Sequence, residues 1–318
     1  SPLDFKPMKI LTKKNFLNYL FLTITGISAA SVLFIIIGIF YMLSSESYLA
    51  IKEFGFINFL TSINWDPVKE SFGSLASLSG TTIITVLAMT MGIPLAIGIA
   101  IFIVEVAPNK LKGIIGGAIE LLAAIPSIIY GMWGFFTLAP LMAKYVEPFL
   151  QRMIGNIPYL AFLVKGTPIG IDVFTASVIL AIMIIPFTAS ITKDSFNLTP
   201  SIVKESAYAI GATKWEVVKD VVFPYSKFGI FGGVAISLGR ALGETMAVAF
   251  VLGNKNMIPT SLFDTATTVT VKLANEFTEA DTDLYLSSLY YLALLLFVLS
   301  FLILAVSKIF LLKAKRES

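Results

Sequence analysis

The chain has 318 residues, of which 57% are hydrophobic and 14% are charged, and its formal net charge is +3. Because soluble domains carry about 25% charged residues, this composition excludes an ordinary soluble fold. The sequence contains no cysteine and no histidine, which excludes disulfides, metal ligation by thiolate or imidazole, and catalysis by a Cys nucleophile or a His base.

Six apolar runs are long enough to cross a bilayer, for which about 20 predominantly apolar residues are needed. The first run is too long for a signal peptide, so we expect it to be retained as a membrane span. The sequence therefore predicts an all-α, polytopic membrane protein with about six transmembrane helices. The predicted spans lie near residues 16–43, 76–104, 113–141, 173–192, 228–252 and 284–312.

Three of these runs contain a proline, at Pro94, Pro126 and Pro186. Proline removes a backbone hydrogen bond and kinks a helix, and membranes tolerate such kinks where neighbouring helices or water satisfy the freed groups. The prolines therefore indicate either ordinary irregularity of a helix bundle or functional bends.

Lysine and arginine are distributed unevenly between the two sides of a six-span arrangement. Both termini and the loops near 105–112 and 193–227 share one side, which carries 15 of the 23 Lys and Arg residues, whereas the other side carries seven. Because cytoplasmic loops are enriched in positive charge, we expect both termini to be cytoplasmic. The positive net charge then reflects the inner face and implies no nucleic-acid partner.

The loops near 45–72, 145–172 and 253–283 should face outward, and each is long enough to pack as short helices. In the first loop, Trp65 could anchor the chain at the membrane surface. The last loop is the most acidic, and it is either a solvated rim or a docking surface for a soluble partner. Its acidic residues are Glu276, Glu279, Asp281 and Asp283.

The inner segment 198–227 should form two short helices joined at a glycine. Thr199 is suited to be an N-cap with Pro200 at the first helical position, and Gly211 can end that helix in a left-handed conformation. Thr213 and Glu216 have the spacing of a capping box, which begins a second helix. Pro224 disfavours helix at Phe223 and should close it before the next span.

This inner segment resembles the EAA loop of ABC-importer permeases, whose pattern is E-A-A, three residues, G, nine residues, I, one residue, L-P. The resemblance implies a coupling helix that docks into a groove of a separate ATPase. The matching positions are Glu205, Ala207, Gly211 and Pro224, and the conservative departures are Ser206, Val221 and Phe223.

Three further stretches resemble the phosphate-specific (Pst-type) branch of these permeases. They are SGTTIITVLAMTMGIPLAIGIAIF (79–102), ELLAAIPSIIYGMWGF (120–135) and GRALGETMAVAFVLGN (239–254), and the likeness is closest to one of the two paired permease subunits. The resemblance implies a second permease subunit, a pair of ATP-binding subunits, an extracytoplasmic phosphate-binding protein and a bacterial-type inner membrane. The chain has no G-x-x-x-x-G-K-[ST] loop, so ATP would be used by a partner and this chain would need no cofactor and perform no covalent catalysis.

The expected organisation follows from the spans and the resemblance. Residues 1–15 form a cytoplasmic N-terminal segment, and residues 16–75 form the first transmembrane helix and an outer loop. Residues 76–312 form the permease core with five transmembrane helices and the EAA-like loop, and residues 313–318 form a cytoplasmic tail.

Arg240 and Glu244 lie near the middle of the fifth apolar run. An arginine at the bilayer centre costs about 2.5–3.5 kcal/mol on insertion scales, and residues four apart on a helix share a face, so the two side chains are expected to pair. Two interpretations remain open. The pair either locks the bundle structurally or forms an anion site on the substrate pathway, because a guanidinium fork matches phosphate oxygens.

Gly239 and Gly243 form a G-x-x-x-G pattern around Arg240, which would let this helix approach a partner subunit. Glu120, at the start of the third run, is more typical of an interfacial carboxylate than of a ligand.

Three functional classes follow. The first is the permease of an ABC importer for phosphate, or for another oxyanion such as sulfate or molybdate. The second is a secondary anion transporter, which would need no EAA-like loop. The third is an intramembrane enzyme or accessory scaffold, and the lack of His and Cys weighs against the enzyme.

Overall fold

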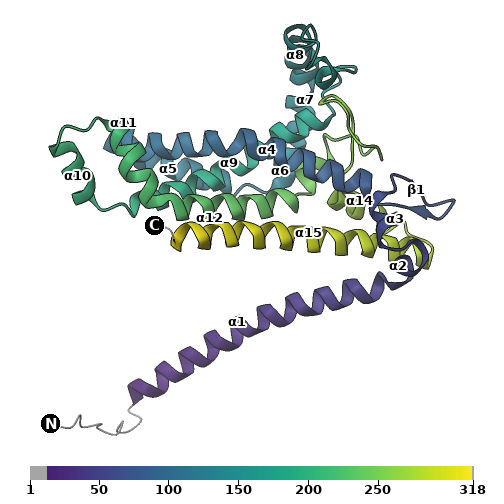
Figure 1. Ribbon diagram of the computed structural model, residues 1–318, viewed down its shortest axis with the longest axis horizontal. Helices are drawn as coiled ribbons and strands as arrows, with labels where there is room; N and C mark the ends of the chain where they lie inside the picture. Colours follow the sequence, from purple (N-terminus) through teal and green to yellow (C-terminus); the bar gives the residue numbers. More distant parts are fainter. Residues whose placement is uncertain (1–12, 317–318) are drawn as a thin grey trace.

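The computed structural model describes residues 13–316, and side chains over residues 18–309. Six long helices run roughly along one axis of the molecule (Figure 1). Five helices of this described part are long and apolar enough to cross a membrane, and the number rises to six if one bent helix pair counts as a single span. The predicted all-α membrane protein with about six spans is therefore confirmed. The long helices are α1 (Lys13–Glu46), α4 (Leu75–Ile101), α5 (Asn109–Ala123), α9 (Val173–Asn197), α12 (Phe223–Leu242) and α15 (Asp283–Arg316).

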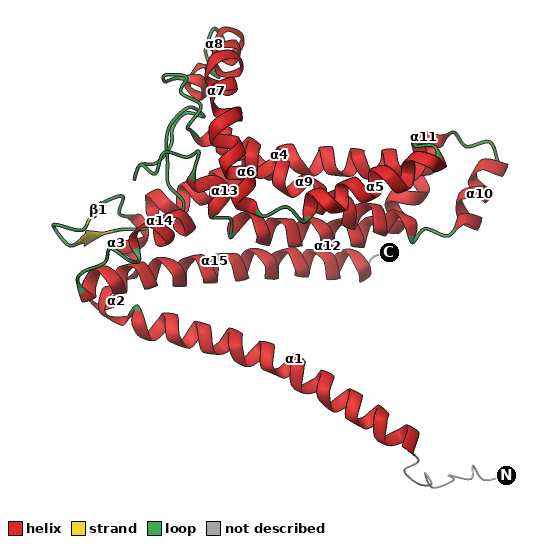
Figure 2. Cartoon of the chain, turned by 180° about the vertical axis from the view of Figure 1, so that it is seen from behind, coloured by secondary structure: helices red, strands yellow, loops and turns green. Residues whose placement is uncertain are grey.

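Shorter elements connect these helices (Figure 2). At one end they are α2 (Tyr48–Phe54), α3 (Phe56–Thr61), the antiparallel pair β1 (Trp65–Asp66) and β2 (Ser71–Phe72), and α14 (Val269–Glu276). At the other end they are the π-helix η1 (Phe102–Val106), α10 (Ser201–Ala209), α11 (Lys214–Glu216) and the π-helix η5 (Val217–Val222). Helix α6 (Ser127–Trp133) and η2 (Gly134–Leu138) pack against the bundle and lead into a projecting arm. The arm contains α7 (Ala139–Leu141), η3 (Met142–Val146), α8 (Glu147–Ile154) and η4 (Ala161–Val164), and α13 (Met246–Ala249) follows α12.

The core of the bundle is the contact of α4 with α9. The buried residues of α4 recur every four positions, and most are alanine or glycine, so the backbones of the two helices lie close together. At Gly92 an added Cβ would lie 3.1 Å from the side chain of Ile184, which shows how little space remains. The row is Ala76, Gly80, Ile84, Ala88, Gly92, Ala96 and Ala100.

Different segments of the chain lie at the two ends of the bundle. The beginning of α1, the end of α15 and the α10–α11 segment lie at one end, and the β1–β2 pair, α2, α3 and α14 lie at the other (Figure 1). This arrangement agrees with an even number of crossings. The short helices of the loops near 45–72, 145–172 and 253–283 match their predicted character.

Helix α1 leaves the rest of the bundle (Figures 1 and 2). Side chains 18–42 are all exposed, and the ring of Phe40 lies 6.1 Å from that of Phe297 in α15. An apolar helix with no covering neighbour needs lipid or another subunit around it.

The predicted span 113–141 is sharply bent at Pro126. Helix α5 ends at Ala123, α6 begins at Ser127, and the two parts are bent by 90°. Pro126 is the physical reason, because proline disfavours helix in the residue before it. The hydroxyl of Tyr130 donates to the carbonyl oxygen of Leu122 across the break at 2.9 Å and satisfies one freed acceptor. Pro94 and Pro186, by contrast, lie inside α4 and α9 without ending them.

The predicted boundaries of the fifth span, 228–252, are also wrong at both ends. Helical structure continues from Lys214 to Leu242 through Pro224, because the wider π-turn of η5 accommodates the missing N–H at the first turn of α12. The helix then ends at Leu242, whereas the hydrophobic pattern alone predicts ten more helical residues.

Candidate functional site

Arg240 lies in the last turn of α12, where the negative end of the helix dipole favours a cation. Its guanidinium carbon stands 5.5 Å from the ring centre of Phe187 in α9, a cation–π arrangement. The Nε atom is buried and has no hydrogen-bond partner. Buried donors are nearly always satisfied, so this unpaired donor is unusual and marks Arg240 as a candidate binding residue.

Glu244 does not share a helix face with Arg240, so the predicted pairing is wrong. Gly243 follows the end of α12, its N–H bonding back to the carbonyl of Gly239 at 3.3 Å. Glu244 therefore lies in the break, and its Oε1 accepts the N–H of Ala247 at 3.1 Å, which caps α13. Both side chains lie in the described part of the chain, and no ion pair within 4.0 Å joins them.

The G-x-x-x-G pattern also has a different role from the predicted one. A Cβ added at Gly239 would meet Leu304 of this chain's own α15 at 3.6 Å, and Gly243 lies beyond the helix. The two glycines therefore do not form one helical surface for a partner subunit.

The two broken helices meet beside this site. A Cβ added at Gly131 of α6 would lie 2.7 Å from the carbonyl oxygen of Met246 and 3.1 Å from the Cα of Ala247. Only glycine permits this contact between α6 and α13. Broken helices at membrane depth free backbone polar groups, and transporters use such breaks to bind substrates and ions. The sequence signals were Pro126, Gly131 and Gly243, which hydrophobicity alone obscures.

A polar contact lies one turn below Arg240. The hydroxyls of Ser237 in α12 and Thr188 in α9 are 2.6 Å apart and fully buried. This bond fixes α12 against α9 at the level where Arg240 faces Phe187.

The inner segment has the predicted elbow geometry. Gly211 has φ +93°, a left-handed conformation that favours glycine, and the Thr213–Glu216 capping box is present, with the N–H of Thr213 donating to Glu216 Oε2 at 2.7 Å. The N-cap prediction was off by one residue, because Pro200 precedes α10 without a side-chain cap. Thr199 instead pairs with the Ser226 hydroxyl at 3.2 Å. Residues 198–216 are called the coupling elbow below.

The EAA-like positions divide into an inner and an outer set. Ala207 and Val221 pack into a cluster with Val217 and Val222. Glu205, Ser206, Gly211, Phe223 and Pro224 are exposed, and the Ser206 hydroxyl donates to the Ile202 carbonyl at 2.7 Å.

The outer surface of the coupling elbow is apolar as well as charged. Ile210 is 88% exposed and Trp215 is 66% exposed. Between them a hollow is lined by Ala207, Gly211, Ala212 and Val217 among others. Apolar side chains gathered on an exposed surface mark a contact with another macromolecule.

At the opposite end, Glu276 is part of an internal network. It accepts from Trp65 Nε1 at 2.5 Å, from Tyr285 Oη at 2.7 Å and from Lys272 Nζ at 3.2 Å. Burial lowers the pKa of the Lys272 ammonium, while Glu276 opposes that change. Trp65 is thus held by protein, contrary to the predicted membrane anchor, and Glu276 does not belong to a free acidic rim.

Two buried carboxyl groups face each other near the start of α9. Asp172 accepts the N–H of Thr175 at 2.8 Å as the N-cap, and the Glu147 carboxyl lies beside it. Glu147 Oε1 and Asp172 Oδ2 are buried without a hydrogen-bond partner, so ionising both carboxyl groups together is unfavourable. Burial raises the pKa of the Asp172 carboxyl.

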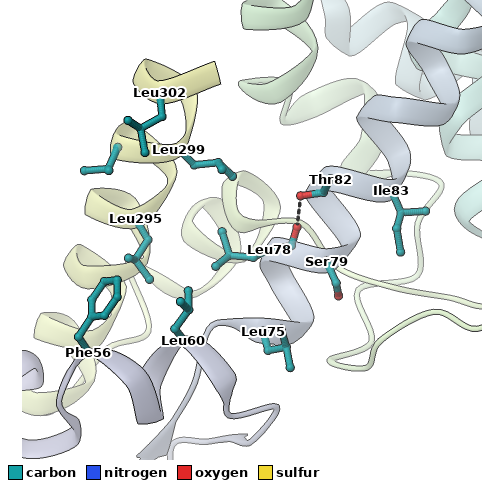
Figure 3. A pocket seen from close by; sticks show the side chains of 11 residues that line it. Phe56, Leu60, Leu75, Leu78, Ser79, Thr82, Ile83, Leu295, Leu299 and Leu302 are labelled. Carbon is teal, nitrogen blue, oxygen red and sulfur yellow. Dashed lines mark hydrogen bonds between the residues drawn. The ribbon is translucent and has the colours of Figure 1, made fainter. Parts of the chain in front are cut away.

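The largest hollow described is an apolar groove of about 560 Å³ between α3, α4 and α15 (Figure 3). Its two hydroxyl side chains, Ser79 and Thr82, bond to the carbonyls of Ala76 and Leu78 in their own helix at 2.8 Å. With no free polar group, this groove is unsuited to an anion. No group of three or more acidic, His or Cys side chains suited to a metal occurs in the described part of the chain.

The family model for the binding-protein-dependent transport system inner membrane component matches residues 92–315. The chain belongs to this family. It is therefore a multi-pass membrane component of a transport system.

Curated relatives match nearly the whole chain. The phosphate transport system permease protein PstC of Mesorhizobium japonicum is 53% identical over 289 residues, covering 91% of this chain and 88% of the relative. The protein of the same name from Pasteurella multocida is 44% identical over 301 residues, covering 95% and 93%.

A solved bacterial ABC transporter involved in the import of the acidic polysaccharide alginate shares the fold. Its TM-score is 0.60 at 16% identity, and the match covers 95% of this chain and 96% of that one. At this identity the likeness concerns the fold alone.

Proposed function

We propose that this chain is the permease subunit of an ATP-driven phosphate importer. The observation that carries the proposal is the buried, unpartnered Nε of Arg240 beside the bend between α5 and α6 and the break between α12 and α13. A guanidinium in a low-dielectric site binds a phosphate oxygen pair strongly and in a fixed orientation. The names of the relatives support phosphate as the anion.

Glu244 and Arg240 have separate roles in this proposal. Arg240 supplies the charge that draws the anion to the break between α12 and α13. Glu244 Oε1 caps α13, and its other oxygen can accept a hydrogen bond from a protonated anion. At neutral pH phosphate carries a proton and sulfate does not, so a carboxylate repels sulfate without compensation.

The coupling elbow supplies the link to ATP. Its exposed Glu205, Ile210 and Trp215 form a surface outside the bundle, which suits docking to a separate ATP-binding subunit. The complete transporter would further contain a second permease subunit, here placed against the exposed α1, and an extracytoplasmic phosphate-binding protein. The basic elbow end, with the start of α1 and the end of α15, then faces the cytoplasm of the cell.

The test is uptake by the complete transporter in lipid vesicles. We expect phosphate uptake that requires ATP on the elbow side and the binding protein on the opposite side, with sulfate and molybdate competing poorly. Vesicles without ATP are the control. Equal uptake without ATP would indicate a secondary transporter, and preferential uptake of sulfate or molybdate would indicate an importer of another oxyanion.

A further inference from the structure

An ion pair connects the coupling elbow to a helix that is not its neighbour in the chain. Lys204 Nζ of α10 lies 2.5 Å from Glu105 Oε1 of η1, at the end of α4. The Lys204 side chain is 18% exposed and that of Glu105 is 10% exposed. Bulk salt screens such a half-desolvated pair weakly, and removing one partner leaves the other charge buried.

The position of Glu105 connects this ion pair to the end of α4. Glu105 lies in a π-turn, an irregularity that frequently marks functional sites. The same turn is held from the other side by Lys112 of α5, whose Nζ donates to the Val104 carbonyl at 2.5 Å. The side chain of Val104 belongs to the apolar cluster that includes Ala207 of α10. One lysine from α5 and one from the coupling elbow thus bind the turn between α4 and α5, the first through a hydrogen bond and the second through an ion pair.

The covalent path from the elbow leads elsewhere. Through Pro200 the elbow is connected to α9, and through η5, which follows α11, it is connected to α12. Helix α4 receives movement of α10 only through non-covalent contacts, of which Lys204–Glu105 is the ionic one described. We propose that Lys204 and Glu105 are positioning residues that carry movement of the coupling elbow to α4, so that ATP hydrolysis drives transport efficiently. This inference rests on the proposed function.

The test compares transport per ATP hydrolysed in the complete transporter in vesicles. We expect Glu105→Gln and Lys204→Gln each to assemble and hydrolyse ATP, yet to move about tenfold less phosphate per ATP, within the usual range of coupling between sites. The double variant Glu105→Lys with Lys204→Glu should recover to within about threefold of the wild type, since it restores the pair.

A second, more exposed ion pair offers a control. Lys193 of α9 lies 2.6 Å from Glu120 of α5 but contacts no part of the elbow through this bond. Glu120→Gln should leave transport per ATP unchanged. Wild-type transport per ATP in either single variant of the Lys204–Glu105 pair, or no recovery in an assembled charge-swap variant, would overturn the inference.

A readout without substrate separates this inference from the proposed function. The natural chain has no cysteine, so spin labels can be attached at Tyr208→Cys in the elbow and Lys110→Cys at the start of α5. Glu105→Gln should broaden the distance distribution between the labels, whereas Glu120→Gln should not. An unchanged distribution in Glu105→Gln would overturn the positioning role, even in a transporter whose anion is not phosphate.

Discussion

The cationic side chains near the elbow and at the break beyond α12 have different partners. Near the elbow, Lys204 and Lys193 each have a carboxylate within 2.6 Å. At the break, Arg240 faces the ring of Phe187, and its Nε has no acceptor. A paired charge fixes one element to another, whereas a guanidinium with a free donor can bind an anion. Under the proposed function, this difference separates the structural cations from the binding cation.

Removing the unpaired cation should have the largest effect. We expect Arg240→Ala to reduce phosphate uptake by about 100-fold or more, because a charge-assisted hydrogen bond contributes about 1.5–3 kcal/mol and a bidentate pair more. Arg152 is exposed in α8, so Arg152→Ala is the matched control. Uptake within about twofold of the wild type in Arg240→Ala would place the anion elsewhere.

Blocking the coupling elbow should separate ATP hydrolysis from transport. A Cβ at Gly211 meets nothing within 4 Å, so the side chain of Gly211→Trp points away from this chain, at the surface proposed to dock the ATP-binding subunit. We expect about a tenfold loss of transport per ATP with normal membrane insertion.

Gly55 provides the control for that variant. It has φ +69° and equally open space, but it lies between α2 and α3 at the opposite end. Gly55→Trp should cost similar backbone strain and leave coupling intact. Wild-type coupling in an inserted Gly211→Trp variant would contradict the docking role of the elbow.

Neutralising the carboxylate at the break should change selectivity by a smaller factor. Glu244→Gln retains an oxygen that can accept the N–H of Ala247, so the cap of α13 survives and only the charge is lost. We expect phosphate uptake to fall about tenfold and sulfate to compete about tenfold better, each equivalent to about 1.4 kcal/mol. If competition uptake in vesicles shows neither change, Glu244 serves only as a helix cap.

The smallest predicted effect concerns buried carboxyls that lack a cation altogether. Because burial raises the pKa of Asp172 in the folded protein, the protonated form is favoured. Its contribution to stability is therefore complete below the ordinary pKa and is lost as pH rises through the folded-state pKa. Asp172→Asn keeps the N-cap and should raise the melting temperature at pH 8 by about 3 °C relative to the wild type.

A melting series from pH 5 to pH 8 in detergent checks this sign. The control is Asp66→Asn, since the Asp66 side chain is 39% exposed, its only ion pair is the surface pair with Lys69, and asparagine keeps the oxygen that accepts the N–H groups of Val68 and Lys69. A wild-type melting temperature that rises with pH, with Asp172→Asn less stable at pH 8, would contradict the assignment.

Local rules were enough to predict the elbow and were not enough for the break. Gly211 and the Thr213–Glu216 box act through bonds within four residues, so their structure can be read from spacing alone. The end of α12 at Gly243 depends on α6 approaching through Gly131, a contact between segments more than 100 residues apart. Hydrophobicity could not reveal it, because both sides of the break are apolar.

The prediction that Pro224 closes the preceding helix was wrong for a local reason. The rule that proline closes a preceding helix assumes an α-turn, and η5 is a wider π-turn. The sequence identified Arg240 and Glu244 as unusual residues for a membrane segment. Their predicted pairing assumed one continuous helix, but α12 ends between them at Leu242.

The row of small residues on α4 has a consequence for how the protein tolerates change. Alanine and glycine have almost no rotamer entropy to lose on burial, so the α4–α9 contact forms without that cost. Truncation cannot damage the glycines, and it leaves little cavity at the alanines. At its small residues the contact is vulnerable to added volume instead: Gly92→Ala forces Ile184 of α9 to shift. At these small residues, substitutions that remove volume are therefore tolerated better than substitutions that add volume.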